Sequence, residues 1–161
     1  MGQRVQGTLN KLSRQLIDSM VNEIVSNKRV ASGDLKNSFK AEIDDDFLGI
    51  RSSVEYASNV DLGRRPGRFP NVNKLQNWIR IKFGDGPYPS RSGGRPLKLK
   101  DLTYLIGRKI SNQGYVGINY TTKALLNAEQ MITKELGDAY LLDLEEQLEK
   151  QIPNLNQWQQ R

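Results

Sequence analysis

Three consecutive aspartates, Asp44, Asp45 and Asp46, are the only clustered carboxylates close to a predicted strand. Such a group can hold a divalent metal ion for phosphoryl-transfer chemistry, so a metal-dependent nuclease that uses Asp44 and Asp46 is one hypothesis. Aspartate is also a frequent turn residue, and at the tip of a β-hairpin the three side chains would be solvated. Because no partner motif accompanies the cluster, we favour the turn.

The chain of 161 residues contains no cysteine and no histidine. Disulfides, thiolate nucleophiles, zinc sites built from Cys and His, and His-based catalytic triads are therefore excluded. The Gly-Asp-Gly and Ser-Gly-Gly steps at 84–86 and 92–94 lack the strand-to-helix frame of a nucleotide-binding loop. We expect a protein that is not an enzyme and that uses no metal and no cofactor.

A second candidate site is the basic segment RRPGR, in which Arg64, Arg65 and Arg68 surround Pro66 and Gly67. Proline restricts its own backbone and that of the preceding residue, which predicts a stiff, exposed loop between two anchored elements. Exposed charges contribute little to stability. The three arginines are therefore either solvated surface charge or a binding surface.

Charge is distributed unevenly along this basic chain, whose net charge is +6. Residues 64–100 carry ten Lys and Arg against one acid, and residues 129–150 carry seven acids against two lysines. Chains with one basic and one acidic region can bind copies of themselves. The candidate contacts are Arg64, Arg65, Arg68, Arg91, Arg95, Lys98 and Lys100 on the basic side, and Glu135, Asp138, Glu145, Glu146 and Glu149 on the acidic side.

The apolar pattern predicts an α+β fold, in which a small antiparallel sheet built from a hairpin is packed by amphipathic helices. We expect a helix over 8–27, a turn at 31–39 capped by Ser32, and a hairpin over 39–54. A second helix is expected to start near Asn71 or Asn73, and a third to cover 98–112. In the segment 55–62, Tyr56, Ala57, Val60 and Leu62 are expected to pack against the sheet, and in the helix after 71, Leu75, Trp78, Ile79 and Phe83 are expected to face the core. The Gly- and Pro-rich segment 84–97 is expected to remain an unpacked loop.

From Thr121 onward a long helix is predicted, with Gly137 as a point where it could kink. Its apolar stripe runs through Leu125, Ala128, Ile132, Leu136, Tyr140, Leu144, Leu148 and Ile152. We expect residues 1–130 to form the α+β domain and 131–161 an acidic helical extension with a polar tail. No stretch approaches the twenty apolar residues that span a bilayer, and the N-terminus lacks a signal-peptide pattern, so we expect synthesis in the cytoplasm and no membrane association.

The order of these elements resembles that of a family of tailed-bacteriophage tail components, whose members are neck, tail-completion or head-to-tail joining proteins. The resemblance covers about residues 8–130. It is carried by a Ser32-Gly33-x-Leu35-x-x-Ser38 turn, the acid-tipped hairpin, a Tyr56-Ala57 pair with Gly63, a Pro/Arg-rich loop, a helix with Leu75 and Trp78, and the segments IGRKISNQG at 106–114 and NYTTKAL at 119–125. Asp61 stands where the family usually has Glu. The long loop at 84–97 and the acidic helix look like variants from crAss-like phages, in which related proteins build rings below the portal.

This resemblance implies a structural virion protein that performs no chemistry. Its copies would form a ring in the phage neck, join the portal or adaptor to the tail, and surround the DNA channel. The arginine loop would then contact an acidic neighbour or the phosphates of passing DNA, for which sequence-independent attraction is enough. The alternative is a sequence-independent nucleic-acid-binding module with Trp78, Phe83 and Tyr88 as stacking platforms.

Overall fold

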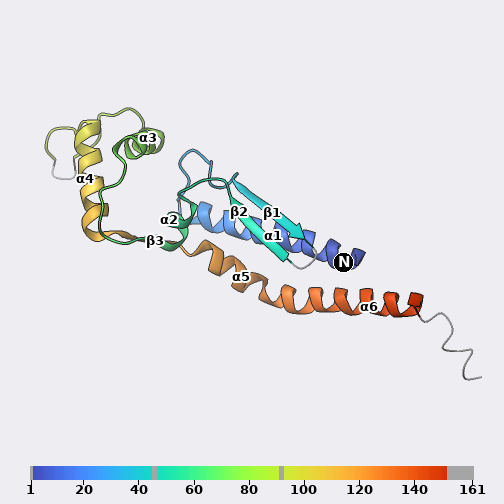
Figure 1. The fold of residues 1–161 in the computed structure, drawn as a ribbon. Coiled ribbons are helices and arrows are strands. Elements are labelled where there is room, and N and C mark those ends of the chain that lie inside the picture. The colour runs from blue at the N-terminus through green and yellow to red at the C-terminus, as the bar shows by residue number, and fades with distance from the viewer. Residues whose placement is uncertain (1, 45–46, 91–92, 152–161) are drawn as a thin grey trace, which may run out of the picture. The chain divides into compact units, whose positions relative to one another are not determined.

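The computed structural model describes residues 2–44, 47–90 and 93–151 of the chain (Figure 1). Its fold is α+β, mainly helical, as the sequence predicts. The helices are α1 (Gln3–Ser26), α2 (Ala57–Leu62), α3 (Val72–Phe83), α4 (Leu99–Gln113), α5 (Tyr120–Met131), the π-helical turn η1 (Ile132–Leu136) and α6 (Gly137–Gln151), and the strands are β1 (Phe39–Asp44), β2 (Phe47–Ser52), β3 (Gly63–Arg64) and β4 (Tyr115–Val116). No helix within the described ranges is long and apolar enough to cross a membrane.

The chain divides into two compact units. The first, which we call the acidic unit, contains the described residues of 1–20, 40–51 and 121–161, and the second, the basic unit, contains 21–39 and 52–120. Among the described residues the basic unit carries fourteen Lys and Arg against six Asp and Glu, a net charge of +8. The acidic unit carries eight against ten, a net charge of −2. The charge asymmetry of the sequence is therefore also an asymmetry between the two folded units.

In the acidic unit, α1 lies beside the β1–β2 hairpin and runs antiparallel to the continuous helix α5–η1–α6 (Figure 1). Polar contacts fix this direction: Ser19 accepts a hydrogen bond from Asn127, and Lys11 pairs with Glu135 at 2.7 Å. The core of the unit contains Val5, Leu9 and Ala139, with Ile43, Leu48 and Leu136 packed around it. The amphipathic pattern of α1 is thus buried between the hairpin and α6, as its periodicity predicts.

The π-helical turn η1 lies immediately before Gly137, the predicted weak point of the long helix. The buried residues on either side of it are Tyr120, Ala124 and Ala128 in α5 and Ala139 and Asp143 in α6. In an uninterrupted α-helix Asp143 would lie about 100° around the axis from Ala124. The wider turn of η1 absorbs roughly one extra residue and brings the two helices into phase.

The predicted apolar stripe is wrong in part. Leu125, Tyr140, Leu144 and Leu148 are about half exposed, whereas the small residues of the helix are buried. Small side chains allow α1 and the α5–α6 helix to approach closely, and the larger apolar residues are left on the outer surfaces. Ile152, the last residue of the predicted stripe, lies outside the described residues.

The core of the basic unit lies between α3 and α4. Leu75, Ile79 and Tyr88 are buried there, and Leu97, Leu99, Leu102 and Ile106 surround them. Asn71 caps α3 by accepting a hydrogen bond from the backbone N–H of Lys74 at 3.0 Å, as one of the two predicted caps. The segment 84–97 has no helix among its described residues, but the expectation that it stays unpacked is wrong, because Tyr88 pairs with Leu97 and is only 4 % exposed.

Two further packing predictions in the basic unit are wrong. Trp78 and Phe83 are 40 % and 56 % exposed and contact each other edge to face, rather than facing the core. Tyr56 and Leu62 are also exposed, and the buried positions of this segment are Ala57 and Asp61. The rings of Trp78 and Phe83 are exposed because Leu75 and Ile79 already fill the face of α3 that packs on α4.

Candidate nucleic-acid interface

The arginine loop, which we define as residues 63–70, begins where the segments of β3 and β4 approach each other very closely. β3 pairs antiparallel with β4, and Arg64 lies opposite Tyr115. Gly63 and Gly114 both have positive φ, and a Cβ atom on either would collide with the opposite backbone. The same holds for Gly117 against the carbonyl of Asp61. These three glycines are needed because no side chain fits between the two segments.

The loop is then fastened to α4 by two kinds of contact. Gly67 and Ser111 are bonded reciprocally: the Gly67 N–H donates to the Ser111 carbonyl at 2.7 Å, and the Ser111 hydroxyl donates to the Gly67 carbonyl at 2.6 Å. The ring of Phe69 lies directly on Gly107 and stacks on Tyr104 with ring centroids 6.4 Å apart. The loop is therefore held at both ends and in its middle, as its proline content suggests.

The three arginines of the loop have different environments. Arg64 is half-buried, and its guanidinium donates to the carbonyl of Arg68 at 2.6 Å, which closes the loop on itself. Burial raises the pKa of the Tyr115 hydroxyl, and the neighbouring charges of Arg64 and Arg29 oppose that rise. Arg65 and Arg68 are exposed, so their guanidinium groups are available to a ligand.

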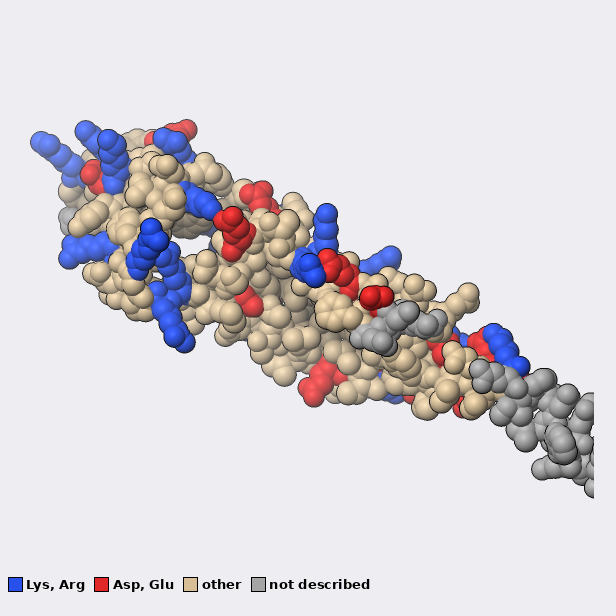
Figure 2. Space-filling view, viewed as in Figure 1, with Lys and Arg blue, Asp and Glu red and all other residues tan. Residues whose placement is uncertain are grey.

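Other basic residues extend this surface over α4. Figure 2 shows Lys and Arg side chains gathered over the part of the basic unit that α3 and α4 build. The predicted contacts Arg95, Lys98 and Lys100 are exposed, and Arg91 lies outside the described residues. Arg108 and Lys109, which were not among the predicted contacts, are exposed on α4 close in sequence to Ser111. Their position within one turn of the loop's anchor is the signal that could have identified them.

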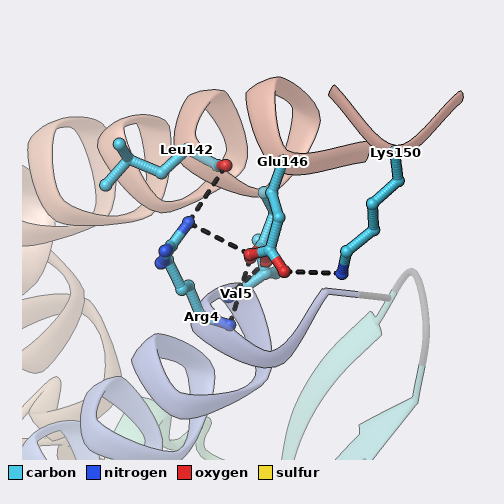
Figure 3. Close-up of polar contacts among 6 residues, drawn as sticks. Arg4, Val5, Leu142, Glu146 and Lys150 are labelled. Carbon is cyan, nitrogen blue, oxygen red and sulfur yellow. Dashed lines mark hydrogen bonds and ion pairs between the residues drawn. The ribbon is translucent and has the colours of Figure 1, made fainter. Parts of the chain in front are cut away.

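The predicted acidic contacts are all on the α5–α6 helix, and the structure divides them into two groups. Glu135 pairs with Lys11, and Glu146 lies between Arg4 at 3.4 Å and Lys150 at 2.6 Å (Figure 3). The hydrogen bond and charge of Lys150, with the charge of Arg4, lower the pKa of Glu146. Asp138, Glu145 and Glu149 are exposed and have no ion pair with another described residue. The second group is thus the one left for an external partner.

Asp143, in the same helix, has a structural task that was not predicted from the sequence. Its carboxylate accepts the backbone N–H groups of Val5 at 2.9 Å and Arg4 at 3.3 Å, and Arg4 also donates to the Leu142 carbonyl (Figure 3). Gly2 precedes the helix and has no side chain to cap it, and a Cβ atom there would collide with Asp143. A residue of α6 therefore supplies the N-cap of α1 from 138 positions away.

The three aspartates that we considered as a possible metal site, and expected to form a turn, are only partly among the described residues. Asp44 ends β1 and is exposed, whereas Asp45 and Asp46 lie outside the described residues. Within 2–44, 47–90 and 93–151 no group of three or more Asp and Glu could hold a metal ion. The described residues thus offer a basic binding surface as the candidate site.

Comparisons with protein-family models, with curated proteins and with solved structures gave no match to this chain. Its function is therefore inferred from its own residues and their geometry.

Proposed function

We propose that this protein is a structural virion component that forms an oligomeric ring in the head–tail connector, or neck, of a tailed bacteriophage. In this role it joins the portal or adaptor to the tail and performs no chemistry of its own. The basic unit faces neighbouring protein or the packaged DNA, and the acidic unit carries contacts to other subunits. Its site of action is the virion, after synthesis in the host cytoplasm.

The observation that carries this proposal is the anchored arginine loop on a unit of net charge +8. Arg65 and Arg68 are exposed on a backbone that β3, Ser111 and Phe69 hold in place. Guanidinium groups on an anchored backbone bind phosphates or carboxylates without reading a sequence, which is what a channel wall or a subunit contact requires. Among the described residues no group of three or more Asp and Glu could hold a metal ion.

Assembly is supported by apolar surface that the acidic unit leaves uncovered. A mainly apolar groove of about 420 Å³ is lined by residues of α1, β2 and α5–α6, including Phe47, Leu125 and Tyr140, which are exposed. Leu141, Leu142, Leu144 and Leu148 are further large apolar residues that are exposed on α6. Contiguous apolar surface of this kind is typical of a protein that binds other proteins.

The test is immunogold electron microscopy of particles from a lysate of the protein's source. Label confined to the junction of head and tail supports the proposal, and negative-stain images of the purified protein should then show closed rings. Intact particles that carry none of the protein contradict it.

A sequence-independent nucleic-acid-binding module is the second candidate, favoured by the exposed Trp78 on the basic unit. Tyr88, its third proposed stacking platform, is buried and does not contribute. This candidate predicts tight, salt-dependent binding of DNA by the isolated protein. Replacing Arg65 and Arg68 by Ala should lower the slope of log K against log salt by about two, roughly one for each phosphate that is no longer neutralised, and Lys36→Ala should not change it.

A further inference from the structure

The outward face of α6 combines apolar and acidic side chains. Opposite the buried row of Ala139 and Asp143, one stripe of the helix carries Asp138, Leu141, Glu145, Leu148 and Glu149. Leu141 is 60 % exposed, and the three acids have no ion pair with another described residue. A stripe that combines apolar side chains with negative charges is typical of a helix that docks on a partner surface with apolar and positively charged residues.

The outward face of α3 has the complementary composition. Trp78 and Ile81 are exposed there, with the ring of Phe83 against Trp78 at 5.8 Å. Lys74 lies on the same side as Ile81, whereas Arg80 borders this face about 100° around the axis from Ile81. The only acidic contacts of the two basic residues within the described residues are with exposed groups: Lys74 pairs with Glu55, and Arg80 reaches Asp85 only at 3.8 Å. Exposed pairs of this kind exchange partners at little cost. Tryptophan and arginine are also the residues most often found at the centre of protein interfaces.

We propose that the outward face of α6 in one copy of the protein docks on the outward face of α3 in a second copy. This inference rests on the proposed assembly of identical subunits and names the surfaces that make it. The contact places Glu145 and Glu149 near Arg80 and Lys74, and Leu141 and Leu148 against Trp78 and Ile81. Because the two faces differ, the contact is heterologous, as a ring requires.

Charge and apolar area favour a second copy over nucleic acid as the occupant of α3. Phosphate would satisfy Arg80 and Lys74, and a base could stack on Trp78, but neither would cover the acidic, apolar face of α6. Docking α6 on α3 covers both exposed faces at once and pairs opposite charges along them. Nucleic acid is accordingly a rival outcome of the test for this face, while the arginine loop lies on α4 and is not involved.

The test uses charge reversal on each face and then a mixture of the two variants. Arg80→Glu places acid against acid at every contact, and Glu145→Arg places base against base, so each alone should weaken self-association at least about tenfold in sedimentation velocity. In an equal mixture, the α3 face of the Arg80→Glu variant meets the α6 face of the Glu145→Arg variant, so opposite charges oppose each other again. The next contact in the ring pairs the native Arg80 with the native Glu145. Assembly should then return to the level of the native protein.

Two exposed residues outside the faces provide matched controls. Asp18→Arg and Lys36→Glu change the net charge by the same amounts and should assemble like the native protein. Circular dichroism of all four variants checks that each is folded. If folded Arg80→Glu and Glu145→Arg variants assemble normally, or if their mixture is no better than either alone, the α6–α3 contact is wrong.

Trp78 gives an independent optical signal. The chain has two tryptophans, so Trp158→Phe leaves Trp78 as the only one. Its emission should shift to the blue as protein concentration rises, and the shift should be absent in Arg80→Glu. If the emission of Trp78 is already shifted to the blue in dilute, monomeric protein, the residue is covered by a contact within one copy. If the emission responds to single-stranded DNA but not to protein concentration, this face is a nucleic-acid site. Either result overturns the proposal. If the native protein never assembles, the proposed ring fails as well; if it assembles without regard to these substitutions, only the contact fails.

Discussion

At the residue scale, Asp143 links the beginning of the described chain to its last helix. Its carboxylate caps α1 with hydrogen bonds to two backbone N–H groups, and it is buried beside Val5. Removing the acceptor leaves two amide groups of a helix terminus without their partners, which is expensive for buried groups.

We expect Asp143→Ala to lower the free energy of unfolding by about 1–2 kcal/mol, the range for loss of a helix N-cap. Asp143→Asn keeps one acceptor oxygen and should lose less. Urea unfolding followed by circular dichroism measures both. Glu146→Gln, at a neighbouring but more exposed carboxylate, is the control and should leave the stability almost unchanged. An Asp143→Ala protein as stable as the native one would contradict the capping role.

Tyr120 gives the second prediction at this scale. Its ring packs edge to face on Phe39, and its hydroxyl donates to the Ala57 carbonyl at 3.2 Å. Burial, followed by the charge of Asp61, raises the pKa of Tyr120 to about 12. The unfolded chain ionises this group near its ordinary value of 10.0. The folded state therefore binds the proton more tightly, and this contribution to stability is complete below pH 10 and is lost as pH rises to about 12.

The measurement is the urea midpoint of the native protein and of Tyr120→Phe at pH values between about 9 and about 12. The native protein should lose stability over this range more steeply than the variant, which has no hydroxyl to ionise. Absorbance at alkaline pH should also show at least one tyrosine that ionises late. Equal pH slopes for the two proteins would show that Tyr120 does not titrate in this way.

At the element scale, two helical glycines have opposite surroundings. Gly7 in α1 has no atom near the position of a Cβ, whereas a Cβ on Gly107 in α4 would enter the ring of Phe69. Gly7 lowers the stability of α1 because glycine is a poor helix former, whereas Gly107 leaves the space that Phe69 of the arginine loop occupies.

We expect Gly7→Ala to raise the free energy of unfolding by about 0.5–1 kcal/mol, because alanine is the better helix former. Gly107→Ala should lower it by about 1–3 kcal/mol, because the Phe69 ring and the loop must shift. Thermal unfolding of the two variants compares them directly. If both substitutions stabilise the protein, Phe69 is not seated on α4 as described.

At the scale of the whole molecule, the unequal charges of the two units give assembly a distinct dependence on salt. Exposed charges on facing subunits are screened when the Debye length falls from about 10 Å at 0.1 M salt to about 3 Å at 1 M. We expect the oligomer to weaken across this range, as measured by sedimentation velocity at fixed protein concentration. Arg80→Glu, in which like charges already face each other, should instead associate better at high salt. If salt affects the two proteins in the same direction, charge does not guide the assembly.

The sequence by itself determined the features that depend on neighbouring residues. The period of α1, the strands of the hairpin and the cap at Asn71 were all predicted, because each follows from apolar spacing or from local capping preferences within a few positions. The uneven charge was also visible, since it requires only counting. The resemblance to phage neck proteins and the role of the arginines remain predictions.

Only the tertiary structure decided which side of α3 and of the α5–α6 helix is buried. Trp78 lies on the surface because the face of α3 against α4 was already filled by Leu75 and Ile79, and periodicity alone cannot rank two apolar faces of one helix. The π turn before Gly137 brought the buried side of α6 into line with that of α5, and the cap of α1 came from Asp143 in α6. These features arise from contacts between segments far apart in the chain, where burial and hydrogen-bond satisfaction outweigh local preference.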